Sequence, residues 1–235
     1  MAFSLPLRRL ALEVLDLVFP PRCSACEVPG DSPFCAVCAE TLLPVPAGCP
    51  VCGVPQDESL LPALRRRCPH CRAHPPRFAL ASAPYLHGGA LADAIHRLKY
   101  EKREDLGAAL AVLFEACAVL QSDVLVPIPL HPRRLRLRGY DQARLLADGA
   151  AKWFRLPVAP LLRRVRETGQ QVGRDRTSRE RSVRGAFATT GEVLGARICL
   201  IDDVLTTGAT ASAAADALLI AGAARVEVRT LARAP

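Results

Sequence analysis

The sequence is poor in aromatic residues and contains no long apolar run. Aromatic side chains make up 5% of its 235 residues, and Trp153 is the single tryptophan. Proteins that hold single-stranded nucleic acid by stacking its bases need a row of exposed aromatic rings, so the composition gives little support to such a platform. No apolar run reaches the ~18 residues of a membrane-spanning helix, and we therefore expect no membrane span.

We also expect no secretion signal. The segment from Leu5 to Phe19 is apolar, but Glu13 and Asp16 interrupt it, and no small-residue cleavage site follows. We interpret residues 1–19 as an amphipathic helix and expect a cytoplasmic protein. Because cytosolic thiols stay reduced, disulfide formation is the weaker of the two uses open to the cysteines of this chain.

Eight of the ten cysteines form four Cys-x-x-Cys pairs in the first third of the chain. The pairs are Cys23/Cys26, Cys35/Cys38, Cys49/Cys52 and Cys68/Cys71. Two thiolates three residues apart can hold one tetrahedral metal ion from a single tight turn, and two such turns complete a four-thiolate zinc site. We expect about two structural zinc ions, with the turns paired either sequentially or in crossed order.

The other two cysteines and two nearby histidines are given structural interpretations. We expect Cys117 in a helix and Cys199 in a buried strand, both free and both behaving as small hydrophobic side chains. His70 lies between Cys68 and Cys71, and His74 follows. Since each site already has four thiols, we expect both histidines at the surface rather than on the metal.

The charge of the chain is positive and unevenly spread. The formal net charge is +8 with neutral cysteines, and two four-thiolate zinc centres, each carrying two negative charges, lower it to about +4. Residues 131–184 hold fifteen Lys/Arg against five Asp/Glu, a net of +10. Such clustering indicates a polyphosphate or nucleic-acid partner, with a solvated arginine-rich face as the alternative.

Beyond a metal-binding module at residues 20–77, strands and helices alternate over residues 78–235. We expect strands over Phe78–Leu86, Val124–Pro129, Val158–Leu162, Phe187–Thr190, Arg197–Ile201 and Val226–Leu231. We expect helices over Leu91–Tyr100, Leu106–Leu120, Gln142–Phe154 and Ala211–Ala221, and a long loop over Arg163–Arg184. The alternation predicts an α/β fold with a mostly parallel sheet, whose ligands bind at the carboxyl ends of the strands.

One short run carries most of the functional signal. The apolar segment ending at Ile201 is followed by Asp202 and Asp203, then by Thr206-Thr207-Gly208-Ala209-Thr210 and an Ala-rich helix. A loop between strand and helix directs backbone N–H groups toward an anion, and carboxylates at a strand end accept hydrogen bonds from sugar hydroxyls. An ordinary Asp turn with a Thr cap is the structural alternative.

This run resembles the 5-phosphoribosyl-1-pyrophosphate (PRPP) motif of type I phosphoribosyltransferases. The resemblance implies Asp202 and Asp203 on the ribose hydroxyls, and Thr206, Thr207, Gly208, Ala209 and Thr210 around the 5-phosphate. It also implies a sheet of the type I phosphoribosyltransferase kind and Mg²⁺ bound together with PRPP.

The chain as a whole resembles the ComF (ComFC) family, in which a cysteine-rich module precedes a phosphoribosyltransferase-like domain. The matching segments include Phe19–Cys23, Leu98–Tyr100, Val126–Arg134, Arg138–Ala143, Arg166–Thr168 and Gly185–Phe187. This resemblance implies a role in DNA uptake during natural transformation, at the cytoplasmic side of the import machinery, with single-stranded DNA as a further partner.

Basic side chains in two of the matching segments suit a pyrophosphate group. Arg133, Arg134 and Arg138 follow a predicted strand end, and guanidinium groups bind phosphate oxygens well. Lys99 supplies a further charge at this group or is a solvated cation at a helix end. The loop at 163–184 occupies the place of the phosphoribosyltransferase lid, which would exclude water from the reacting ribose.

Two positions depart from the ComF pattern. Asp141 and Ser182 stand where family members usually have Asn, and a carboxylate at position 141 would repel a phosphate rather than donate to it. Two classes of function remain. One is a PRPP-binding protein associated with competence, and the other is an active phosphoribosyltransferase acting on an unidentified base or amine.

Overall fold

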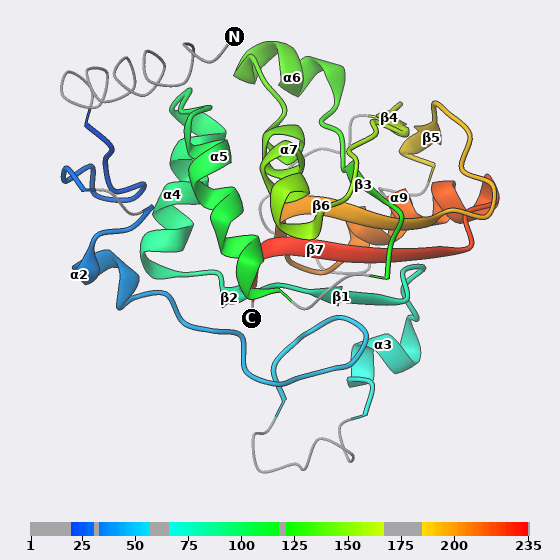
Figure 1. The fold of residues 1–235 in the computed structure, drawn as a ribbon. Coiled ribbons are helices and arrows are strands. Elements are labelled where there is room, and N and C mark those ends of the chain that lie inside the picture. Colours follow the sequence, from blue (N-terminus) through cyan, green and yellow to red (C-terminus); the bar gives the residue numbers. More distant parts are fainter. Residues whose placement is uncertain (1–19, 31–32, 57–65, 118–120, 167–184, 235) are drawn as a thin grey trace, which may run out of the picture.

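The computed structural model describes residues 20–30, 33–56, 66–117, 121–166 and 185–234, and Figure 1 shows their arrangement. The predicted helix at residues 1–19, most of the predicted loop at 163–184 and Ser182 lie outside these ranges. A central sheet runs through the molecule, helices cover it, and the cysteine-rich segments lie along its outside.

The central sheet is parallel, as predicted. Its strands are β1 (Leu80–Ser82), β2 (Tyr85–Leu86), β3 (Val124–Pro127), β6 (Arg197–Leu205) and β7 (Arg225–Arg233). Their order is β1-β7-β6-β3, with β2 also pairing with β7, and every pair is parallel. A separate antiparallel pair joins β4 (Leu162–Arg164) to β5 (Phe187–Thr189). The predicted α/β class is therefore confirmed.

Helices cover both faces of the sheet. They are α2 (Ala36–Ala39), α3 (Pro69–Ala73), α4 (Gly89–Tyr100), α5 (Leu106–Ala111), α6 (Pro132–Arg138), α7 (Gln142–Phe154) and α9 (Ala209–Ile220), with a 3₁₀ helix at Val112–Ala116. Side chains of β6 alternate between two cores, because successive residues of a strand point to opposite faces. Ile198 and Leu200 pack on the α9 side, whereas Cys199 and Ile201 pack on the side of α4, α5 and α7.

Several predicted elements differ in extent. The strand expected at Phe78–Leu86 is divided into β1 and β2, and Pro84, which has no N–H to donate, lies in the break. The helix expected at Leu106–Leu120 changes to 3₁₀ geometry after Ala111, and this tighter turn ends at Ala116. Cys117 therefore follows a helix with an extended backbone instead of lying within one.

The strand expected at Val158–Leu162 was wrong in its position. Only Val158 forms a bridge, to Leu125, and the strand itself begins at Leu162 and continues into the predicted loop. Pro157 and Pro160 remove the N–H groups that a longer ladder would need. The helix α6 was not predicted, because its sequence PRRLRLR has no helical apolar spacing and buries none of its residues.

The strand β6 is longer than its apolar segment. We expected it to end at Ile201, but it continues to Leu205 because β7 offers partners as far as Arg233. Asp202 pairs in register with Thr230, so both motif carboxylates lie inside the last part of the ladder rather than beyond it. The following helix, α9, begins two residues earlier than expected, at Ala209.

Candidate functional site: two cysteine clusters and the carboxyl end of β6

Eight cysteines form two separate clusters. Cys23, Cys26, Cys35 and Cys38 make the first cluster, and Cys49, Cys52, Cys68 and Cys71 make the second, with the Sγ atoms of each cluster all within 4.8 Å of one another. The turns are therefore paired sequentially, and the crossed alternative is wrong.

The spacing of the sulfur atoms fits tetrahedral zinc. The Sγ atoms of Cys26 and Cys35 are 3.6 Å apart, and those of Cys52 and Cys68 are 3.7 Å apart. Four zinc–sulfur bonds of ~2.3 Å would place the sulfurs roughly 3.8 Å from one another, whereas a disulfide needs ~2.05 Å. All eight thiols are free. The two clusters therefore have the ligands and the geometry for two structural zinc ions.

The thiols of each cluster have strongly divergent pKa values. Burial raises the pKa of Cys49, but the N–H groups of Cys52 and Cys68 lower it more, to about 7. Burial and the neighbouring thiols raise the pKa of Cys71. In the first cluster backbone N–H groups, acting against burial, bring the pKa of Cys23 to about 6. Four thiolates at this distance require a cation, which zinc supplies when bound.

The first turn of each cluster has the same design. Residues 23–29 read CSACEVP and residues 49–55 read CPVCGVP. In both turns the N–H of the first cysteine donates to the carbonyl five residues later, at 2.9 Å. Glu27 and Gly53, which follow the second cysteine, have φ angles of +62° and +65°. The second turn of each cluster opens a short helix, α2 or α3, with a cysteine at its N-cap.

The remaining cysteines and the histidines behave largely as predicted. Cys199 is fully buried in the α4-side core, and burial raises its pKa to about 12. Cys117 packs against the same core, and burial raises its pKa to about 11. The rings of His70 and His74 contact each other in a tilted arrangement, with 5.6 Å between their centroids, and neither histidine belongs to a cysteine cluster.

The two motif carboxylates lie on opposite sides of β6. Asp203 is 3% exposed and faces α4, where its Oδ1 atom is 2.7 Å from Nζ of Lys99. Burial lowers the pKa of Lys99, but Asp203 raises it more, so the ammonium group stays charged. Lys99 is therefore not a solvated helix-end cation, and it pairs directly with the predicted ribose-binding motif.

Asp202 has a different environment. It is half-buried, and its Oδ1 atom accepts a hydrogen bond from the N–H of Asp203 at 2.9 Å. Burial, and after it the charge of Asp203, raise the pKa of Asp202 to about 8. A carboxylate with so high a pKa binds a cation or a hydroxyl donor readily, because either partner stabilises its ionised form.

The threonine-rich loop connects β6 to α9. Gly208 is the N-cap of α9, and its φ of +79° is a conformation that glycine adopts without strain. The Oγ1 atom of Thr207 accepts from the N–H of Ala209 at 3.3 Å, while Thr206 is exposed and Thr210 lies in the first turn of the helix. The loop thus places hydroxyl and N–H groups at the start of a twelve-residue helix.

Arginines from α6 and β4 lie near this end of the sheet. Nη1 of Arg138 donates to Oε1 of Gln142, and its guanidinium stacks over the Tyr100 ring at 5.5 Å. Burial lowers the pKa of Arg164, and the charge of Arg134 on α6 lowers it further, while Asp202 opposes the shift. Arg164 was not among the predicted site residues, because it fell in a segment that had no recognisable pattern.

The carboxylate of Asp141 accepts hydrogen bonds from backbone N–H groups. Its Oδ1 atom accepts from the N–H groups of Ala143 and Arg144, which caps α7, and its Oδ2 atom accepts from the N–H of Leu130 at 2.8 Å. The predicted repulsion of a phosphate is therefore not its structural role. An Asn, which has one acceptor oxygen, would not make both contacts.

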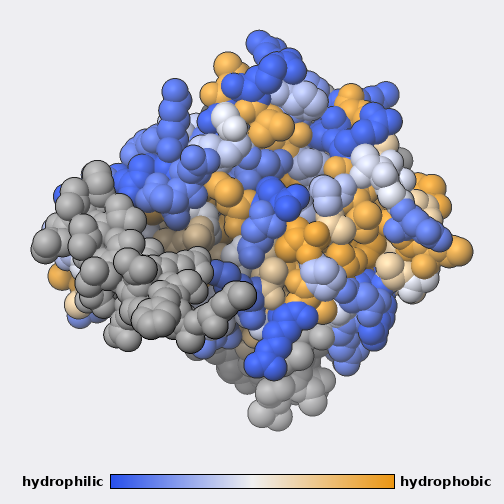
Figure 2. All heavy atoms as spheres, turned by 45° about the horizontal axis from the view of Figure 1, so that its top comes forward, coloured by the Kyte–Doolittle hydropathy of each residue, from blue (hydrophilic) through white to orange (hydrophobic). Residues whose placement is uncertain are grey.

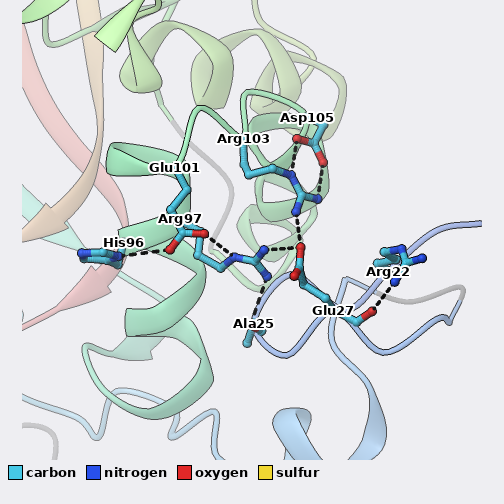
Figure 3. A network of polar contacts seen from close by, with 8 residues as sticks. All are labelled: Arg22, Ala25, Glu27, His96, Arg97, Glu101, Arg103 and Asp105. Atoms are coloured by element: carbon cyan, nitrogen blue, oxygen red, sulfur yellow. Dashed lines mark hydrogen bonds and ion pairs between the residues drawn. The ribbon is translucent and has the colours of Figure 1, made fainter. Parts of the chain in front are cut away.

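Figure 3 shows a polar network that joins the first cysteine cluster to α4. Glu27 lies between two guanidinium groups, pairing with Arg97 and, at 2.7 Å, with Arg103. Arg97 also donates to the carbonyl of Ala25 at 3.2 Å, inside the metal-binding turn. Because Arg97 is two residues from Lys99, this network holds the end of α4 that faces Asp203.

Among the helices of the described residues, none combines the length and the apolar character needed to cross a membrane.

Comparison with known proteins gives two kinds of match. The double zinc ribbon domain family matches residues 14–72. The DNA utilization protein YhgH of Escherichia coli K12 is 31% identical over 229 residues, covering 92% of this chain and 99% of its own. The competence protein ComFC of Bacillus subtilis is 32% identical over 212 residues, covering 86% and 85%.

Among solved structures, the glutamine PRPP amidotransferase from B. subtilis complexed with ADP and GMP is similar at a TM-score of 0.36 and 26% identity. The match covers 58% of this chain and 27% of the amidotransferase.

Proposed function

The chain belongs to the ComF family, and we propose that it is a PRPP-binding, phosphoribosyltransferase-like protein associated with DNA uptake in natural transformation. Two relatives that match most of the chain are named a DNA utilization protein and a competence protein. We further propose that it acts in the cytoplasm and comprises a helix at 1–19, a double zinc ribbon at 20–77 and a phosphoribosyltransferase-like domain at 78–235.

One observation carries the PRPP assignment. Two carboxylates and the loop at Thr206–Thr210 lie at the same end of β6, and the half-buried Lys99 forms an ion pair with Asp203 at 2.7 Å. A phosphate is bound by N–H and hydroxyl donors, whereas a ribose diol is bound by hydrogen-bond acceptors. The loop supplies the donors and the carboxylates supply the acceptors, only a few residues apart. In this proposal Asp202 and Asp203 bind the ribose hydroxyls, and residues 206–210 hold the 5-phosphate.

The pyrophosphate of PRPP would meet the basic side chains around this end of the sheet. We assign it to Arg133, Arg134 and Arg138, with Lys99 near the ribose. Mg²⁺, when bound with PRPP, would neutralise charge on the phosphate oxygens. The raised pKa of Asp202 supports this assignment, since the ionised carboxylate is stabilised when a cation is nearby.

DNA association is supported by the helix α6. This helix buries none of its residues, and Leu137 is 76% exposed beside the arginines. Figure 2 shows the face turned toward the viewer, on which hydrophilic residues lie beside a broad hydrophobic area. The arginines of α6 can neutralise the phosphates of a polyanion such as single-stranded DNA. We propose that α6 contacts either DNA or the import machinery.

Calorimetric titration with PRPP and Mg²⁺ tests the site. Replacing Asp202→Asn together with Asp203→Asn removes two charged hydrogen-bond acceptors, each worth about 1.5–3 kcal/mol, so affinity should fall roughly a hundredfold or more. Asp148→Asn is the control, because Asp148 pairs with Arg144 on the surface of α7, away from the motif. Unchanged affinity in the double variant contradicts the ribose role.

Salt-dependent binding tests the DNA assignment. Single-strand affinity should fall with salt at a logarithmic slope of about −0.7 for each phosphate neutralised, and Arg133→Glu with Arg136→Glu should flatten that slope. A salt-insensitive affinity contradicts the assignment. Pyrophosphate release from PRPP and Mg²⁺ in the presence of candidate bases separates a catalytic protein from one that only binds PRPP.

A further inference from the structure

Arg233, the last residue of β7, is a buried cation between the second cysteine cluster and the 206–210 loop. Its side chain is 2% exposed. Its Nε atom donates to the carbonyl of Cys52 at 3.0 Å. Its Nη1 atom donates to the carbonyls of Leu205 at 3.0 Å and Thr206 at 2.9 Å, and also to that of Ala234. One guanidinium therefore joins a metal-binding turn to the beginning of the loop.

These bonds orient the peptide groups at the beginning of the loop. In a trans peptide group the C=O and the N–H point in opposite directions. Because Arg233 holds the carbonyl oxygens of Leu205 and Thr206, the N–H groups of Thr206 and Thr207 are directed away from the guanidinium. That side of the turn leads to exposed Thr206 and to the start of α9. Anions bind where successive N–H groups are held in this way.

The charge of Arg233 has no carboxylate partner among the described residues, and its hydrogen bonds go to four backbone carbonyls. Burial of a cation without a counter-ion is costly, and carbonyl dipoles offset only part of that cost. Two anions close to Arg233 would offset its positive charge. A zinc-bound four-thiolate cluster carries two net negative charges on the Cys52 side, and a phosphate would add more on the Thr206 side.

We propose that Arg233 is a positioning residue that couples metal occupancy of the second cysteine cluster to the phosphate affinity of the 206–210 loop. The inference rests on the proposed function, since it assigns a means of control to the same phosphate site. When the cluster loses its metal, the Cys49–Cys52 turn is released and Nε loses the Cys52 carbonyl. The guanidinium is then no longer held against Leu205 and Thr206, and the loop loses its orientation.

The coupling is reciprocal by thermodynamic necessity. If metal in the second cluster strengthens phosphate binding, phosphate must strengthen metal retention by the same factor. The first cluster offers a contrast, because its ion pairs run through Glu27 to Arg97 and Arg103, and among the described residues none of these links reaches the loop. Metal loss from the first cluster therefore leaves the loop as it was.

Arg229 provides a matched control for Arg233. It lies on the same strand and is 3% exposed, but it donates to the carbonyl of Val228 and faces Glu227, away from the loop. Calorimetric titration with ribose 5-phosphate compares Arg233→Lys with Arg229→Lys, while zinc content and thermal unfolding are measured for both.

Lysine keeps the charge but cannot span Cys52 and Thr206 together. We expect Arg233→Lys to weaken ribose 5-phosphate binding at least about tenfold and Arg229→Lys to leave it within about twofold, both with two zinc ions bound. Equal weakening in the two variants, or none in Arg233→Lys, overturns the proposal.

Hydrogen exchange at residues 205–210 tests the coupling without any ligand. In the wild type, Cys52→Ser should raise exchange at Thr206 and Thr207, whereas Cys26→Ser in the first cluster should not. In the Arg233→Lys background exchange should already be high, and Cys52→Ser should add nothing. Unaltered exchange in Cys52→Ser overturns the coupling. A wild type that binds neither ribose 5-phosphate nor PRPP contradicts the proposed function, and the exchange experiment still decides the role of Arg233.

Discussion

The two cysteine clusters are built from the same turn but are attached to opposite faces of the sheet. Cys23 belongs to the core on the side of α4, α5 and α7, whereas all four cysteines of the second cluster belong to the core on the α9 side. The second cluster is fully buried, while Cys26 of the first is exposed. The two clusters therefore have the same four cysteine ligands, but the surrounding protein buries the second cluster more completely than the first.

The residue after the second cysteine of each turn has the same backbone conformation in both clusters but makes different contacts. Glu27 and Gly53 both have positive φ, but only Glu27 has a side chain, and it forms ion pairs with Arg97 and Arg103. At Gly53 a Cβ atom would lie 3.1 Å from the carbonyl oxygen of Ala81. The first turn thus attaches through a side chain, and the second through close backbone approach to β1.

The clusters also brace different parts of the candidate site. The first holds the end of α4, which carries Lys99 against Asp203, and the second holds the loop through Arg233. The two motif carboxylates are divided between the same two faces. Asp203 faces α4, and Asp202 lies on the opposite face of β6. Each cluster therefore braces one half of the candidate site from its own face of the sheet.

The largest contrast is expected when one ligand is removed from each cluster. Cys49→Ser should lower the free energy of unfolding by several kcal/mol, because structural zinc binding contributes directly to folding there. Cys26→Ser should cost clearly less, since Cys26 is exposed and the first cluster packs against less of the core. Urea denaturation with zinc analysis measures both. Equal costs would mean that burial does not distinguish the clusters.

Metal removal should follow the same order. With a zinc chelator in excess, we expect two phases, the first cluster losing metal about tenfold faster, which corresponds to an opening free energy lower by ~1.4 kcal/mol. Release monitored with a chromogenic chelator, in the wild type and in Cys26→Ser, identifies each phase. A single phase, or a fast phase that survives in Cys26→Ser, would show that the first cluster does not release its metal faster than the second.

Substitution at the two positive-φ positions should have unequal effects. Gly53→Ala strains the backbone and presses a Cβ toward the carbonyl of Ala81, so it should cost about 1–3 kcal/mol. Glu27→Gly relieves backbone strain while it removes the ion pairs to Arg97 and Arg103, so the two effects oppose each other and the net change should be smaller. Thermal unfolding of the two variants checks this order, with Glu27→Gln as the control that keeps the side chain.

The last expectation concerns Asp202, whose contribution to stability has a defined pH dependence. Its pKa is raised to about 8, so between the ordinary value of 3.8 and 8 the folded state holds a proton that the unfolded state releases. Stability contributed by this group is therefore lost as the pH rises through that window. Asp202→Asn should raise the melting temperature more at pH 8 than at pH 5. A constant difference would contradict the raised pKa.

Much of the fold followed from local pattern. The helix at Gln142–Phe154 has the predicted bounds, because its apolar spacing and its Asp141 cap act within one segment. The hairpin strand at Phe187 and the buried strand at Cys199 were also predicted correctly. Two predictions failed. At Val158–Leu162 prolines lack the N–H groups that the expected strand would need, and α6 was missed because its sequence has no helical apolar spacing. The ribose and phosphate roles of the motif residues stay predictions.

The eight metal ligands, the parallel α/β class and the order of carboxylates, loop and helix could all be predicted, because spacing along the chain sets each of these. Three contacts became visible only in the folded chain: the cysteine turns pair sequentially, Lys99 pairs with Asp203, and Arg233 joins Cys52 to Thr206. Arg233 is 181 residues from Cys52 along the chain. A contact across such a distance depends on how β7 packs against the cysteine-rich segment, and no local spacing contains that information.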